Sequence, residues 1–178
     1  MQRRHHCRGF TLIELMVTVA IVVVLIALAA PSLRSYTAKK KVEGAAAELA
    51  SDIQFARSEA VSRNKNVRIT FGSNCYVIHE FDAAATCTSA PSSTVLRTVE
   101  IADATSVVLS PLNSLTYIEF DSVRGLATFN STVTTLASIS VQTGPSVSAT
   151  VQLRATMTPF GRVQVCTTNN MAGYSSCT

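Results

Sequence analysis

Glu14 is the residue of the sequence whose type and place most strongly suggest chemistry. It stands at the head of an apolar run, because residues 15–30 are apolar at every position except Thr18. A carboxylate in such a run is costly in lipid and usually has a functional partner. Residues 1–9, which precede the run, are short, basic and polar. Glu14 is therefore predicted to be a functional residue whose charge is neutralised by another group.

The apolar run is long enough to cross a membrane. Counting from Phe10 to Pro31 gives 22 residues, or roughly 33 Å of helix. The basic segment 1–9 is predicted to stay in the cytoplasm, with the rest of the chain outside it. A cleaved secretory signal is the alternative, because Ala27-Leu28-Ala29 has the small residues of a cleavage site. Glu14 argues against that alternative.

The segment Gly9-Phe10-Thr11-Leu12-Ile13-Glu14-Leu15 resembles the N-terminal signal of type IV pilins and type II secretion pseudopilins. The resemblance implies that a prepilin peptidase cleaves between Gly9 and Phe10, that the new Phe10 amine is methylated, and that the apolar helix is kept. It also implies that Pro31 stands where many pilins carry a helix-kinking proline. Glu14 would pair with the positive Phe10 amine of a neighbouring subunit and set the axial register of the filament, as a buried polar pair can. The alternative is a Glu14 side chain that merely reaches the lipid headgroups.

After Pro31 the pattern becomes that of an amphipathic helix ending near residues 63–66. Lys39, Lys40 and Lys41 lie mostly off its apolar stripe and are predicted to form a solvated face or to contact phospholipid headgroups rather than nucleic acid. The stripe recurs at spacings of three and four and is expected to lie on a core; its members are Val42, Ala46, Leu49, Ile53, Ala56 and Ala60.

From Val67 onward the sequence alternates with a period of two, which predicts β-strands separated by turns. Gly144-Pro145 and Pro159-Phe160-Gly161 are predicted to be turns. We expect an α+β chain with a leader at 1–9, a membrane helix at 10–31, an amphipathic helix at 32–66 and one antiparallel β head at 67–178. The predicted strands are Val67–Phe71, Cys75–Phe81, Val95–Ile101, Leu115–Phe120, Leu126–Phe129, Ala137–Thr143, Val147–Arg154 and Gly161–Cys166.

Four cysteines remain once Cys7 is lost with the leader: Cys75, Cys87, Cys166 and Cys177. An even number in an exported domain predicts two disulfides, for which three connectivities are possible. We favour Cys75–Cys87 and Cys166–Cys177, because each bond would close a short loop. A metal site is disfavoured by the lack of a CxxC pair and by the oxidising compartment, and no cofactor is expected.

Three segments after the membrane helix narrow the resemblance to one family of pilin-like proteins. Residues 52–61 resemble the helix-end signature of the GspH/FimT family, and residues 120–125 and 158–163 are similar to its later motifs. The family includes the H pseudopilin of type II secretion and the minor pilins FimT and FimU. The resemblance implies the type IV pilin fold, with a long helix packed against two antiparallel sheets. It implies a structural minor pilin that moves from the inner membrane into a type IV pilus with other pilins as partners, or alternatively a type II secretion pseudopilin.

A third possibility is a minor pilin that binds double-stranded DNA during natural transformation. Some FimT proteins do so with a Gly-Arg-x-Arg motif, which Gly161-Arg162-Val163-Gln164 matches except that Gln164 replaces the second arginine. Phosphate binding scales with the number of cations engaged. Arg154 is expected near Arg162 if their strands pair, and Lys65 and Arg68 are further candidates. An ordinary turn residue is the alternative role for Arg162.

An enzyme is not expected. His79 is the single histidine after the leader and lies inside a predicted strand, where a structural role is usual. No nucleophile, base and orienting group can be recognised around it. Without residues 1–9, 12 basic residues face 11 acidic ones, so a basic field over the whole protein is excluded.

Overall fold

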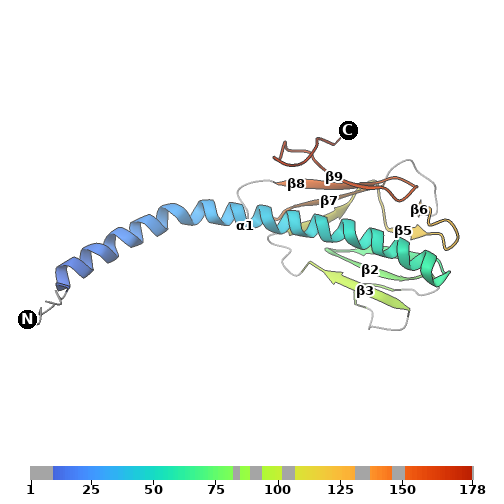
Figure 1. Ribbon diagram of the computed structural model, residues 1–178, viewed down its shortest axis with the longest axis horizontal. Helices are drawn as coiled ribbons and strands as arrows, with labels where there is room; N and C mark the ends of the chain where they lie inside the picture. The colour runs from blue at the N-terminus through green and yellow to red at the C-terminus, as the bar shows by residue number, and fades with distance from the viewer. Residues whose placement is uncertain are drawn as a thin grey trace, which may run out of the picture.

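The computed structural model describes residues 10–81, 85–88, 94–101, 107–130, 137–145 and 151–177. Gly9 and the rest of the predicted leader lie outside the described residues. The described chain consists of one long helix and a β head that packs against its C-terminal half (Figure 1).

Helix α1 (Leu12–Arg63) is a single helix of 52 residues that contains both predicted halves. Thr11 caps its start, because the Thr11 hydroxyl accepts a hydrogen bond of 3.3 Å from the Glu14 amide. The helix ends where the sequence predicts. Asn64 adopts the left-handed conformation with φ 52°, and the Lys65 amide donates to the Ala60 carbonyl at 3.2 Å. The helix runs past residue 31 without interruption and curves gently (Figure 1).

The N-terminal part of α1 is the one described segment that is long and apolar enough to cross a membrane, over Leu12–Ala30. None of it is buried inside the molecule. Leu12 is 76% exposed and Leu28 is 72% exposed. The head therefore leaves this whole apolar surface uncovered.

The head contains two antiparallel sheets. The first has the order β3-β2-β1-β5-β6 and the second has the order β4-β7-β8-β9. Both sheets contact the C-terminal half of α1, as Figure 1 shows. The strands are β1 (Val67–Gly72), β2 (Cys75–Glu80), β3 (Val95–Glu100), β4 (Val107–Pro111), β5 (Tyr117–Phe120), β6 (Ala127–Phe129), β7 (Ala137–Thr143), β8 (Gln152–Met157) and β9 (Val163–Thr167).

The core lies between α1 and the two sheets. The six stripe residues predicted from the sequence are each 1% exposed or less. Ile69 and Phe120 from the first sheet, and Ile139 and Leu153 from the second, belong to the same cluster. Burial of this stripe fixes the head to the helix mainly through the hydrophobic effect.

The largest differences from the prediction are in β4 and β8, whereas the other strands agree with it to within two residues at each end. β4 was not predicted, although Val107 and Leu109 alternate with less buried neighbours. β8 begins and ends later than the predicted Val147–Arg154, and residues 146–150 lie outside the described residues. Leu153, Ala155 and Met157 continue the buried alternation through β8. The prediction stopped too early because Arg154 and Thr156 are polar, yet they occupy the less buried face of that strand.

Candidate functional sites

The first candidate site is the start of α1. Glu14 lies in the first helical turn, and its carboxylate has no ion pair among the residues that the structure describes. Phe10, just before the helix, is 75% exposed. An exposed apolar helix that carries one unpaired carboxylate can associate with other apolar helices, provided that a cation meets the carboxylate.

The second candidate site lies at the far end of the head, where two hairpin turns meet α1. Residues 121–126 connect β5 to β6, and residues 158–162 connect β8 to β9. The Ala127 amide donates to the Pro159 carbonyl at 2.8 Å, so the two turns are joined directly. We call these two turns, together with Gln54 and Arg57 of α1, the paired-turn site.

Side chains of α1 hold both turns of the paired-turn site. Gln54 Nε2 donates to the Gly161 carbonyl at 2.9 Å, and Arg57 Nε donates to the Gly125 carbonyl at 3.0 Å. Both glycines have positive φ, 60° at Gly125 and 77° at Gly161. A Cβ on Gly161 would lie 2.9 Å from Cδ and Nε of Arg57. Glycine is thus required twice over, by backbone conformation and by the close approach of Arg57.

The paired turns present an apolar surface next to cations. A cavity of about 630 Å³ lies between them, lined in part by Leu126 and Pro159. Val123 is 75% exposed and Phe160 is 74% exposed at its rim. Arg124 also lines the cavity, and Arg162 is exposed in the second turn. Such an apolar patch with polar edges is typical of a contact surface for another macromolecule.

The four residues considered for DNA binding do not form one patch. Arg162 and Gln164 are exposed, but Gly161 is buried beneath Arg57. The expectation that Arg154 lies near Arg162 is wrong. β8 and β9 do pair, but their register places Arg154 opposite Cys166, whereas Arg162 pairs with Thr158. Arg154 and Thr158 are four residues apart on one chain, or roughly 13 Å at the rise of an extended strand.

Lys65 and Arg68, the other cations considered, are engaged in ion pairs within the head. Lys65 Nζ lies 2.7 Å from Glu80 Oε2. Arg68 Nη2 lies 2.9 Å from Glu119 Oε2, and its guanidinium stacks 4.0 Å from the ring centroid of Tyr117. These partners neutralise the charges that phosphate groups would need.

A polar cluster around the buried Asp52 carboxylate joins α1 to the first sheet. The Tyr76 hydroxyl donates to Asp52 Oδ2 at 2.8 Å, and Arg97 Nη1 lies 2.7 Å from Asp52 Oδ1. Burial raises the pKa of Asp52, while its bonds to Tyr76 and Arg97 act in the opposite direction. Arg97 also pairs with Glu48 at 2.9 Å. The cluster orients β3 relative to the helix, and among the described residues no group of metal-ligating side chains accompanies it.

His79 has the structural role expected of it. It is 2% exposed on β2, with Nε2 2.9 Å from the Thr70 hydroxyl and Nδ1 2.8 Å from the Glu80 carbonyl. Burial lowers the pKa of the His79 ring. Both ring nitrogens are occupied, so this histidine has no free nitrogen for acid–base chemistry.

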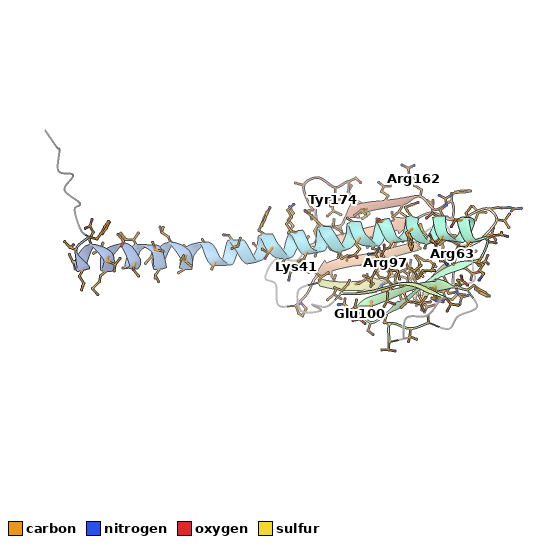
Figure 2. The ribbon with its side chains drawn as sticks, turned by 60° about the horizontal axis from the view of Figure 1, so that its bottom comes forward. Lys41, Arg63, Arg97, Glu100, Arg162 and Tyr174 are labelled. Atoms are coloured by element: carbon orange, nitrogen blue, oxygen red, sulfur yellow. A yellow bond between two sulfur atoms is a disulfide. The ribbon has the colours of Figure 1, made fainter. Side chains whose placement is uncertain are left out.

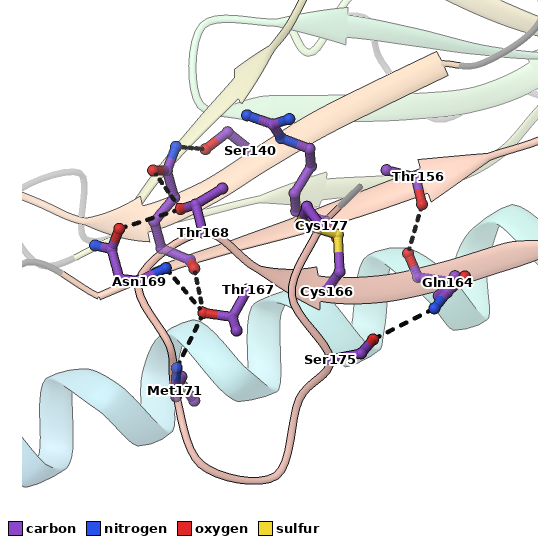
Figure 3. Close-up of a disulfide and its surroundings, with 12 residues drawn as sticks. Ser140, Thr156, Gln164, Cys166, Thr167, Thr168, Asn169, Met171, Ser175 and Cys177 are labelled. Atoms are coloured by element: carbon purple, nitrogen blue, oxygen red, sulfur yellow. Dashed lines mark hydrogen bonds between the residues drawn. A yellow bond between two sulfur atoms is a disulfide. The ribbon is translucent and has the colours of Figure 1, made fainter.

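Two disulfides join Cys75 to Cys87 and Cys166 to Cys177. Figure 3 shows the second one at the base of the C-terminal loop. The Thr167 hydroxyl accepts hydrogen bonds from the amides of Asn169 and Met171, and Gln164 Nε2 donates to the Ser175 hydroxyl at 3.4 Å. These bonds and the disulfide hold the loop against the second sheet.

Sequence reasoning missed the roles of Gln54 and Arg57. Both lie in the segment 52–61 that carries the family resemblance, and Gly125 and Gly161 lie in the other two resembling segments. The three segments are far apart in sequence, yet they meet at the paired-turn site. A helix arginine and two turn glycines were the available signal, but one sequence does not show that they touch.

Comparisons with known proteins agree with this architecture. The "Prokaryotic N-terminal methylation motif" model matches residues 4–30. Two curated proteins of Pseudomonas aeruginosa, each named "Fimbrial protein", are 42% identical over 60 residues, which are 34% of this chain and 38% of the relative. The chain therefore matches well under half the length of these relatives.

A crystal structure of the type IV minor pilin FimU of Pseudomonas aeruginosa shares the fold. It has a TM-score of 0.52 and 19% identity, and the match covers 73% of this chain and 91% of that one. The family model described as "Type II transport protein GspH" matches residues 45–157. Because this match covers more than half of the chain, and because the long helix and two antiparallel sheets are those of a type IV pilin, the protein belongs to the GspH family of pilin-like proteins.

Proposed function

We propose that this chain is a minor pilin that is anchored in the inner membrane by α1 and then assembled at or near the tip of a type IV pilus. The observation that carries the proposal is the uncovered apolar segment Leu12–Ala30, continuous with the helix that holds the head. Apolar surface of this extent has to be covered by lipid before assembly and by other apolar helices after it.

The proposal includes processing of the precursor. A prepilin peptidase cleaves between Gly9 and Phe10, and the new Phe10 amine is methylated. The methylation-motif match over residues 4–30 supports both steps. The amine and Glu14 then supply opposite charges near the same end of α1, and the pairing joins one subunit's Glu14 to the Phe10 amine of its neighbour.

The test is replacement of Glu14 by alanine in cells that make pili. The precursor is expected to be cleaved normally, while the amount of this chain in sheared pili falls at least tenfold. Glu100→Gln is a matched control, because Glu100 is an exposed carboxylate on β3 of the head and lies outside the apolar segment Leu12–Ala30. Normal incorporation of the Glu14→Ala chain would refute the assembly role.

A type II secretion pseudopilin is the second candidate, favoured by the description of the matching family model. Both candidate proteins have the same arrangement of helix and head. They differ in the assembly that they join, which is a type IV pilus in the first case and a type II secretion system in the second. Deletion of the gene would impair piliation in the first case and release of secreted enzymes in the second.

DNA binding by the pilus tip stays a third proposal. It is supported by the exposure of Arg162 and Gln164 on one hairpin. Arg162→Ala would then weaken duplex binding at low salt, whereas Arg154→Ala would have little effect, because Arg154 lies far along β8.

A further inference from the structure

A basic segment of α1 lies between the membrane span and the head. From residue 31 to residue 42 the sequence contains four cations and no acidic residue. Three of the cations are Lys39, Lys40 and Lys41. The first helix residue buried by the head is Ala38, which is 4% exposed. Figure 2 shows Lys41 and Tyr174 at the end of the head nearest the apolar helix, with Arg63 and Arg162 toward the other end.

The uninterrupted helix fixes how far these lysines lie from the membrane. Lys39 and Lys41 follow Ala30, the last residue of the span, by nine and eleven residues, which is roughly 13–17 Å along the axis. The headgroup zone itself extends about 5–7 Å beyond the hydrocarbon. The Cα–Cβ bonds of a helix tilt toward its N-terminus, so the long lysine stems lean toward the membrane and bring their ammonium groups closer to it.

An exposed aromatic residue lies between the lysines and the span. Tyr36 is 58% exposed, and Lys40 Nζ is 5.8 Å from its ring centroid. Tyr36 follows Ala30 by six residues, or about 9 Å of helix. The side chains of a helix lean toward its N-terminus, which brings the Tyr36 ring toward the headgroup zone, where tyrosine is enriched. Going away from the lipid, the chain thus has first an aromatic residue that can contact the headgroup zone and then cations that can contact phosphate groups.

One carboxylate of α1, Glu43, lies next to the lysines of the segment. Lys40 Nζ lies 2.7 Å from Glu43 Oε2, and the hydrogen bond with this carboxylate raises the pKa of Lys40. The Lys40 side chain is still 54% exposed. Residues 31–43 contain four cations and one carboxylate, Glu43, so this stretch of α1 keeps a net positive charge close to the membrane surface.

We propose that Tyr36, Lys39, Lys40 and Lys41 form a basic collar that binds anionic phospholipid headgroups in the outer leaflet of the inner membrane. The inference rests on the proposed membrane location of the chain but adds a lipid-binding role. The collar holds the base of the head at the membrane surface, and these contacts have to be released when the subunit enters a filament.

The test uses the full chain reconstituted in bilayers that contain spin-labelled phosphatidylglycerol or phosphatidylcholine. The selectivity for phosphatidylglycerol is read from the motionally restricted fraction of each lipid. Near an anionic surface each lysine contributes about a fivefold gain in binding at most. We expect the variant with Lys39→Gln, Lys40→Gln and Lys41→Gln to lose at least half of the wild-type selectivity. Screening at about 1 M salt should have the same effect.

Two further variants make the result specific. Replacement of the same three lysines by arginine preserves charge and should preserve selectivity. Lys65→Gln, Arg124→Gln and Arg162→Gln together remove an equal charge from the far end of the head and should leave selectivity unchanged.

Equal selectivity in the wild type and the collar glutamine variant would overturn the proposal, as would an equal loss in the far-end control. Duplex DNA bound by the wild type and lost in the collar variant, without lipid selectivity, would assign the lysines to nucleic acid instead. The readout involves no pilus, so failure of the collar is distinct from failure of the proposed pilin function.

Discussion

His79 links the protonation of one side chain to the stability of the head. Its Nδ1 donates to the Glu80 carbonyl, so Nε2 accepts from the Thr70 hydroxyl, and the ring fits this pair of contacts in its neutral form. Burial and the nearby Arg68 both lower its pKa from the ordinary value of 6.5. Protonation would force Nε2 to donate and would place a second cation beside Arg68.

The free energy of unfolding is therefore expected to fall as the pH drops below 6.5. In that range the unfolded chain binds a proton that the folded chain does not, so acid favours unfolding, by up to about 1.4 kcal/mol per pH unit. Urea unfolding at about pH 7.5 and about pH 5.5, followed by near-ultraviolet circular dichroism, measures the change. His79→Gln should remove most of the dependence in this range. A dependence that is the same in both chains would assign the effect to other groups.

Single residues were predicted well where local sequence decides their role. The helix end at Asn64 and the structural place of His79 follow from pattern or composition. Glu14 lies at the head of the apolar helix as predicted, and its role in assembly stays a prediction. The neighbours of Arg154 depend on the register of β8 against β9, and one residue of shift moves every side chain to the other face. The ion pairs of Lys65 and Arg68 likewise depend on partners from other strands.

At the scale of elements, α1 and the two hairpin turns form a unit that tolerates little change. Gly161→Ala places a Cβ against Arg57 at a residue with φ 77°. We expect it to lower the free energy of unfolding by about 1–3 kcal/mol. Urea unfolding of the purified full chain in detergent measures the loss.

Gly44→Ala is the matched control for Gly161→Ala. A Cβ on Gly44 meets nothing within 4 Å, and Gly44 is an ordinary position of α1. Alanine is the better helix former, so this variant should gain about 0.5–1 kcal/mol. If both substitutions changed the free energy of unfolding in the same direction, the argument from the contact between Arg57 and Gly161 would be wrong.

The elements themselves followed from the sequence wherever their periodicity was long. The stripe of α1, the β7 strand and the turn at residues 159–161 lie where they were predicted. β4 was missed because its sequence, Val107-Val108-Leu109-Ser110-Pro111, does not alternate between apolar and polar residues. The predicted bounds of β8 were too early because a strand in this sheet can carry arginine and threonine on its less buried face. The arrangement of strands into two sheets came from the family resemblance, since long-range pairing has no local pattern.

At the scale of the whole molecule, the chain is predicted to place its head outside the cytoplasm. Ser51→Cys adds a thiol on the exposed face of α1 beside the head, whereas Val23→Cys adds one inside the membrane span. A membrane-impermeant maleimide applied to spheroplasts should label the first and not the second. The four native cysteines of the head form disulfides and do not react. Labelling of Ser51→Cys only after the membrane is broken would reverse the topology.

The unbroken α1 also determines how the molecule would carry a mechanical load. A pull applied at the Phe10 end travels along one rod, through helical hydrogen bonds that lie parallel to the force. The head is attached along the side of that rod by the stripe from Val42 to Ala60, about 27 Å of contact. The load would reach the head as shear spread over this contact and the Arg97–Asp52 and Arg57–Gly125 bonds. The strands would not be pulled apart one by one. The β head therefore needs only a modest free energy of unfolding while the helix bears the tension.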